Sequence, residues 1–286
     1  MRVLLISVLT AAIIAFITVK LAQPDIKAPE QKESAFARVM RTNILRCGYV
    51  ILPPEFERDP NTGKFGGIAH DLAEELGKRL NLKIEWTEEV NFATIGAAME
   101  AGRFDAFCFT SYRYSPLARV MDYSLPVFYT ATGVYVRSND HRFDNNFSAI
   151  NDPAVTLATI DGEMSQFIAR DDFPNAKTLS LPQSTPLSDM LQNVVTNKAD
   201  VAFSNSAIAA PYLVANPGQL RNIAVDKPIR VFGHGFGLKA GEHELKAAID
   251  IVFAEMLNDG TVEKILARHE KAPGSILRAM PGYKIN

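Results

Sequence analysis

Few residues of this sequence stand in a pattern that could do chemistry. One such pattern is Asp161-Gly162-Glu163-Met164, which precedes a predicted helix. Backbone N–H groups at a helix N-terminus can bind an anion, although the Glu163 carboxylate offsets part of the helix dipole. A carboxylate among aromatic side chains can instead serve as a general acid or base, because burial raises its pKa. We favour the simpler interpretation, an acid that the helix dipole stabilises.

Other catalytic signatures are missing from the sequence. It contains no GxSxG, HExxH, P-loop or GxGxxG motif, and its five histidines show no metal-ligand spacing. We therefore expect no metal site and no cofactor. The glycines of Gly233-His234-Gly235-Phe236-Gly237 fall on a predicted strand, where they would allow close backbone packing near a hinge. His70, near a helix start, is expected to be solvated unless the protein is an enzyme.

The two cysteines, Cys47 and Cys108, each lie in an apolar, strand-like stretch. An oxidising compartment would allow a disulfide between them. Free cysteine is commonly buried as a small hydrophobic residue, and we favour that interpretation.

Composition and charge describe an ordinary globular protein. Of the 286 residues, 47% are apolar and 22% charged, with a net charge of −2. No basic block or basic-aromatic run is present, which excludes a nucleic-acid partner on electrostatic grounds.

The N-terminus predicts export. Residues 3–19 form a run without charge. This run is longer than a usual signal core of roughly 7–15 residues and approaches the length of a membrane span. Cleavage after Ala22 would place Lys20 at a position that prefers a small residue. We therefore favour an uncleaved anchor in residues 1–20 over a cleaved signal peptide. Residues 21–42 follow as a tether and a short lead-in helix.

Behind the tether, strands and helices alternate. Predicted strands at 44–50, 82–87 and 105–110 are separated by helices, with Ile68, Leu72, Leu76 and Leu80 at helical spacing. A second α/β unit begins after residue 137, with strands at 155–160, 177–181 and 201–204. This alternation predicts parallel sheets, which bind ligands beyond the carboxyl ends of their strands. Two such units joined by two extended segments predict lobes that move on a hinge.

Five motifs of this sequence resemble the family 3 (polar amino acid type) periplasmic solute-binding proteins of ABC transporters. They occur in the family's order and cover about residues 43–270. The motifs are Gly66–Leu76, Ala101–Ala106, Asp122–Pro126, Asn197–Ala202 and Asn258–Ile265.

The resemblance implies a type II periplasmic-binding-protein-like α/β fold, with two lobes, a hinge and an interlobe cleft. Lobe one would be residues 43–133 plus 232–286, and lobe two residues 138–228. It also implies a periplasmic monomer that binds a small molecule and works with an ABC permease, anchored to the membrane through residues 3–19 if these are kept.

Both charged anchors of the family's amino-acid binders are absent at the matching positions. The arginine that holds the ligand carboxylate corresponds to Leu117, and the aspartate that holds the ammonium corresponds to Asn205. A shift of the alignment could bring in Arg119, and a rebuilt loop could bring in Arg119 or Arg113. We favour a ligand other than a standard α-amino acid, because unpaired buried charges are costly.

Three of the eight remaining predicted ligand contacts are aromatic. Phe92 matches the family's stacking aromatic residue. Leu52 takes the place of another aromatic residue that is common in the family, and Tyr112 takes the place of a small hydroxyl residue, with Tyr49 nearby in the sequence. Thr110, Gly162, Glu163 and Met164 complete the predicted cleft, which suits an apolar or planar solute with few charges.

Three functions fit these observations. We favour a non-enzymatic solute-binding protein that captures an amino-acid-like or small organic or aromatic compound for ABC transport. An exported enzyme resembling cyclohexadienyl dehydratase, with Glu163 as its acid or base, is the first alternative. A membrane-tethered sensory ligand-binding domain is the second.

Overall fold

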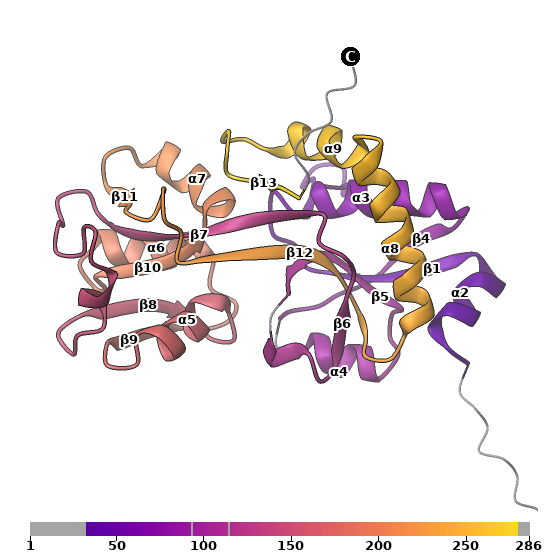
Figure 1. The fold of residues 1–286 in the computed structure, drawn as a ribbon, viewed down its shortest axis with the longest axis horizontal. Helices are drawn as coiled ribbons and strands as arrows, with labels where there is room; N and C mark the ends of the chain where they lie inside the picture. Colours follow the sequence, from indigo (N-terminus) through magenta and orange to yellow (C-terminus); the bar gives the residue numbers. More distant parts are fainter. Residues whose placement is uncertain (1–32, 93, 114, 280–286) are drawn as a thin grey trace, which may run out of the picture. The chain divides into compact units, whose positions relative to one another are not determined.

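The computed structural model describes residues 33–92, 94–113 and 115–279, and those from Ala35 onward belong to one compact unit. Helices and strands alternate along this unit (Figure 1). The helices are α2 (Ala35–Thr42), α3 (Ile68–Leu80), α4 (Ile95–Glu100), α5 (Met164–Asp172), α6 (Leu187–Val195), α7 (Ser206–Ala215), α8 (His243–Asn258) and α9 (Thr261–His269), with 3-10 helices η1 (Ser115–Leu117) and η2 (Phe147–Ile150). The strands are β1 (Ile44–Tyr49), β2 (Glu57–Arg58), β3 (Phe65–Gly66), β4 (Lys83–Glu89), β5 (Ala106–Tyr112), β6 (Met121–Tyr123), β7 (Phe128–Arg137), β8 (Thr156–Ile160), β9 (Lys177–Leu181), β10 (Val201–Asn205), β11 (Leu220–Asn222), β12 (Arg230–Lys239) and β13 (Leu277–Arg278).

Helix α3 shows how the sequence sets an element's ends. Leu72 and Leu76, one helical turn apart, are fully buried on the same face. The helix follows Gly67, which has a φ of 104° and leaves no room for a side chain, because a Cβ would lie 2.7 Å from the Glu55 carbonyl oxygen. It ends at Asn81 in the left-handed conformation.

The main sheet has the order β4-β1-β5-β12-β7-β10-β8-β9. Strands β4, β1 and β5 are parallel, and so are β10, β8 and β9. Strands β12 and β7 are antiparallel to their neighbours and to each other. Two parallel α/β units are therefore joined through two long strands, which lie side by side (Figure 1).

Buried apolar residues fall into separate groups. The first core combines residues of the N-terminal segment, such as Leu45 and Phe107, with Phe236 and Phe253 of the C-terminal segment. Residues between 134 and 224 form the remaining clusters. This agrees with two lobes of which the first is completed by the C-terminal segment; their residue bounds stay a prediction.

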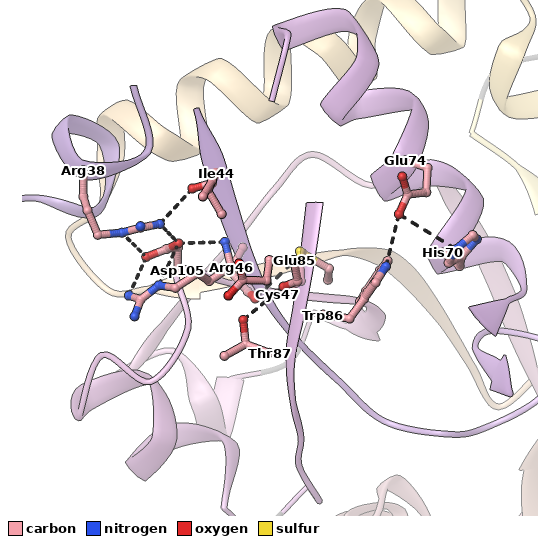
Figure 2. The surroundings of a disulfide bond; sticks show 12 residues. Arg38, Ile44, Arg46, Cys47, His70, Glu74, Glu85, Trp86, Thr87 and Asp105 are labelled. Atoms are coloured by element: carbon pink, nitrogen blue, oxygen red, sulfur yellow. Dashed lines mark hydrogen bonds and ion pairs between the residues drawn. A yellow bond between two sulfur atoms is a disulfide. The ribbon is translucent and has the colours of Figure 1, made fainter. Parts of the chain in front are cut away.

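Cys47 and Cys108 are joined by a disulfide, so the favoured prediction of two free thiols was wrong (Figure 2). The bond links the neighbouring parallel strands β1 and β5, where Cys47 pairs in register with Ala106. The two Cα atoms are 5.3 Å apart, within the range that a disulfide spans. Pairing of adjacent strands, which sequence spacing does not reveal, brought the thiols together.

Asp105, just before β5, is buried between two arginines (Figure 2). Its carboxylate accepts hydrogen bonds from Arg38 Nε at 2.9 Å and from Arg46 Nη2 and the Arg46 backbone N–H, both at 2.8 Å. Because Arg38 lies on α2, this cluster fastens the lead-in helix to the first sheet.

One helix differs from the sequence-based expectation, and one predicted segment is not tested. Helix α7 was not predicted, because Pro211 within it argues against a helix. The predicted anchor in residues 1–20 lies outside the described residues. Among the residues that are described, no helix is both long and apolar enough to cross a membrane.

Candidate functional site

A cavity of about 320 Å³ has walls from both cores, with Phe109 from the first and Ile168 from the second. Its volume is in the range of small-molecule sites. A larger cavity of about 840 Å³ shares walls with it, including Leu52, Phe92 and Glu163, so the two form one cleft.

Nine of the twelve predicted ligand contacts line the smaller cavity. Most lie at or just after the carboxyl ends of β5, β8 and β10, where a parallel sheet places a ligand. They are Leu52, Phe92, Thr110, Tyr112, Leu117, Gly162, Glu163, Met164 and Asn205.

Three predicted contacts lie elsewhere. Arg113 and Arg119 are exposed and line neither cavity. Tyr49 is buried in an aromatic cluster of the first core, with its ring 4.9 Å from that of Phe56. His70 stacks on Trp86 beside this cluster and is half-buried, so it is only partly solvated.

Glu163 caps α5 with its own side chain. Its carboxylate accepts a hydrogen bond from the Ser165 backbone N–H at 2.7 Å and another from the Met164 backbone N–H. Gly162 N–H donates to the Gln166 side chain at 3.0 Å. Burial raises the pKa of Glu163, and the backbone bonds oppose that rise. The amides predicted to receive a ligand anion are therefore bound by groups of the chain itself.

Glu55 is a wall residue that the sequence analysis missed. It is 2% exposed, lines the smaller cavity and accepts a hydrogen bond from the Thr110 hydroxyl. Burial raises its pKa to about 8, against the opposing effect of that bond. The available signal was an acid placed between Pro54 and Phe56 in an otherwise apolar stretch.

His234 continues this polar group into the hinge strands. Its Nδ1 lies 2.7 Å from the Thr110 carbonyl oxygen, to which it must donate. Its Nε2 then accepts from the Thr130 hydroxyl, also at 2.7 Å. Burial lowers the pKa of His234 to about 4, so the ring is neutral at physiological pH. As predicted, the neighbouring glycines pack closely: a Cβ at Gly235 would lie 3.0 Å from the Ser124 carbonyl oxygen.

Arginine side chains in the smaller cavity already have carboxylate partners. Arg170 pairs with Asp171 at 2.6 Å, and Arg230 pairs with Asp172. Asn205 accepts from the Ala207 backbone N–H at 2.8 Å and directs its amide nitrogen toward the Tyr112 hydroxyl at 3.5 Å. Each arginine that the structure describes in this wall is thus paired with an aspartate of the chain, which already balances its charge.

Aromatic rings supply much of the remaining wall. Phe92 meets Phe109 edge to face at 6.0 Å, and Tyr112 lies 5.0 Å from Phe232. Burial raises the pKa of the Tyr112 hydroxyl, and the charges of Glu163 and Glu55 raise it further. The described residues contain no cluster of three or more metal-ligating side chains. The smaller cavity therefore offers aromatic surface, the two buried carboxyl groups of Glu55 and Glu163, and the Asp171 carboxylate that is paired with Arg170.

Solved structures share this fold. The ancestral amino acid-binding protein AncCDT-1, a precursor of cyclohexadienyl dehydratase, superimposes with a TM-score of 0.71 over 84% of this chain and 100% of its own, at 25% identity. The solute receptor for L-cysteine of Neisseria gonorrhoeae reaches 0.70 over 86% of this chain and 99% of its own, at 18% identity. The fold is that of type II periplasmic binding proteins.

The chain belongs to family 3 of the bacterial extracellular solute-binding proteins, whose profile matches residues 45–271. The histidine-binding periplasmic protein of Salmonella typhimurium is 23% identical over 248 residues, which cover 82% of this chain and 90% of that protein. Its Escherichia coli K12 counterpart is 22% identical over the same length. The chain is thus a solute-binding protein, and its family implies an extracytoplasmic location.

Proposed function

We propose that this protein captures a small organic solute in its cleft and delivers it to an ABC-type permease, without catalysis. The solute is an amino-acid-like or small organic or aromatic compound other than a standard α-amino acid. Its contacts are the nine predicted residues of the smaller cavity together with Glu55. Closure of residues 138–228 onto the first lobe would bury the solute.

One observation carries this proposal: the smaller cavity has aromatic and carboxyl walls, and its arginines are ion-paired. A zwitterion entering it would need a cationic partner for its carboxylate, and an unpaired buried charge costs several kcal/mol. The relatives are named for histidine binding, and the solved neighbours include an ancestral arginine-binding protein, a putative binding component complexed with lysine, and a solute receptor for L-cysteine. Leu117 and Asn205 set this chain apart from amino-acid binders of that kind.

Thermal-shift screening of the purified protein against amino acids, organic acids, aromatic acids and amines tests this function. A ligand at about 100 times its Kd stabilises the folded state by about 2.7 kcal/mol, which raises Tm measurably. A compound other than a standard amino acid should give the largest rise. If a standard amino acid gives the largest rise instead, the exclusion of free amino acids is wrong.

A dehydratase is the second candidate, because the pKa of Glu163 is raised beside Tyr112 in the cleft. A carboxyl group tuned in this way can transfer protons to a bound substrate. The likeness to a precursor of cyclohexadienyl dehydratase supports the same idea. Turnover of prephenate or arogenate by the purified protein, lost in Glu163→Gln, would establish an enzyme.

We further propose a periplasmic monomer in which residues 3–19 direct export and then hold the protein at the inner membrane. The mass of the exported protein distinguishes an anchor from a cleaved signal, and retention in the membrane fraction gives an independent check. Solute uptake that fails when the gene is deleted would favour transport over a sensory role.

A further inference from the structure

We infer that the ligand of the smaller cavity is a small organic amine, bound in its ammonium form and lacking a carboxylate. This inference rests on the proposed solute-binding function and specifies the class of solute. Four features of the wall support it: its acids, the lack of an anion partner, its aromatic rings, and a buried hydroxyl.

The acids come from opposite sides of the cleft. Glu55 precedes α3 of the first core, and Glu163 caps α5 of the second. Both lie near Tyr112, since the charges of both act on its hydroxyl. A cation between them would be held by both lobes and would favour the closed state, because carboxylates in a low-dielectric site need a positive partner.

Anionic groups have no corresponding partner in this wall. The amides at the start of α5 are bonded to Glu163, and Arg170 and Arg230 are paired with aspartates. A ligand carboxylate entering this cavity would meet the carboxyl groups of Glu55 and Glu163 instead. Whether protonated or charged, neither acid supplies the positive partner that a buried carboxylate needs, so the wall selects against amino acids as well as organic acids.

The aromatic rings accommodate the body of an amine. Phe92, Phe109, Tyr112 and Phe232 contribute faces or edges to the same cavity as the two acids. Aromatic faces attract organic cations and also bury their apolar carbons. Carboxyl groups beside aromatic rings therefore match a cation with an apolar body better than they match an inorganic ion.

Ser111 supplies an acceptor for an ammonium proton. Its hydroxyl oxygen is buried in the cavity wall, and no hydrogen-bond partner for it occurs among the described residues. Buried hydroxyl groups are rarely left without a partner in a folded protein. A ligand with N–H donors would satisfy this oxygen and at the same time pair with the carboxyl groups.

Matched ligands that differ by one carboxylate test the inference. Isothermal titration of the purified protein should compare L-phenylalanine, L-histidine, L-arginine and L-lysine with phenethylamine, histamine, agmatine and cadaverine, the amines left when each loses its carboxylate. 3-Phenylpropionate is the matched acid without an amine. We expect the best amine to bind at least tenfold more tightly than its parent amino acid, and the acid to show no binding.

The outcomes separate this inference from the proposed function. Tightest binding of an amino acid or of the acid would overturn the amine inference while leaving solute binding in place. Absence of binding by every compound would overturn the amine inference, and the broader thermal-shift screen then decides whether the protein binds another solute.

Single substitutions locate the interaction. Glu163→Gln keeps an oxygen that can cap α5, and Glu55→Gln keeps an acceptor for Thr110, so both variants should fold. Each should weaken binding of the best amine by tenfold or more. Glu244→Gln, an exposed position on α8, is the matched control and should bind as the unchanged protein does. Unchanged amine affinity in both cleft variants would overturn the inference even if an amine binds.

Discussion

The Thr110 hydroxyl donates a hydrogen bond to the Glu55 carboxyl group within the wall of the cleft. Burial raises the pKa of Glu55 to about 8, so this group is mostly protonated at neutral pH before a ligand arrives. An acid that is neutral in the folded protein and charged in the unfolded chain links stability to pH.

Glu55→Gln should flatten this pH dependence. Between the ordinary pKa of a glutamic acid and about 8, only the folded protein holds the proton. The Glu55 contribution to the free energy of unfolding therefore falls as pH rises, by roughly 1.4 kcal/mol per pH unit at most. In urea unfolding, the Glu55→Gln variant and the unchanged protein should have similar stabilities near pH 5. Near pH 8.5 the variant should be the more stable of the two.

Glu244→Gln serves as the control for that measurement, because Glu244 is an exposed acid that lines neither cavity. Equal stability of the Glu55→Gln variant and the unchanged protein at the higher pH would show that Glu55 is not held protonated.

The disulfide should contribute strongly to stability, since it closes a loop between residues 61 positions apart. Replacing both Cys47 and Cys108 by alanine should lower the free energy of unfolding by about 2–5 kcal/mol. Urea titration with and without dithiothreitol checks this. The reductant should destabilise the unchanged protein and have no further effect on the double variant; a response of the double variant would contradict the disulfide as its target.

Local patterns predicted the elements, whereas contacts distant in sequence were harder to foresee. Leu72 and Leu76 indicate α3 through their helical spacing alone, and strand alternation places Thr110 and Asn205 at ligand-facing ends. Glu55 was missed because its burial depends on β5, more than fifty residues away in sequence. The cysteine pair depends on the same kind of long-range strand pairing.

Leu117→Arg combined with Asn205→Asp should give the cleft affinity for a free amino acid. Leu117 and Asn205 line the cavity, and the sequence motifs predict that they stand at the positions of the family's charged anchors. The substitutions would supply a partner for each end of a zwitterion, which we expect to improve amino-acid binding at least tenfold. Isothermal titration with the amino-acid panel measures this change.

Arg119 provides the comparison for that experiment. In the background of Leu117→Arg and Asn205→Asp, Arg119→Ala tests whether the gained amino-acid binding uses Arg119, which is exposed and lines neither cavity. We expect Arg119→Ala to have no effect, and a loss of binding would mean that the carboxylate anchor lies at 119 rather than at 117.

Amine binding should release a proton near neutral pH. An ammonium group beside Glu55 favours its carboxylate and so lowers its pKa from about 8. Affinity should therefore rise by up to tenfold per pH unit as pH approaches 8, and then level off. His234 is neutral throughout this range, and Tyr112 does not ionise in it because its pKa is raised, so the carboxyl groups of Glu55 and Glu163 account for the effect.

Titration in phosphate and in Tris at one pH measures this release, because the two buffers take up a proton with different heats. The binding enthalpy should differ between the buffers, and Glu55→Gln should reduce the difference to the part that Glu163 contributes. Equal heats in the two buffers would mean that no proton leaves on binding, and that Glu55 does not become the counter-ion of the amine.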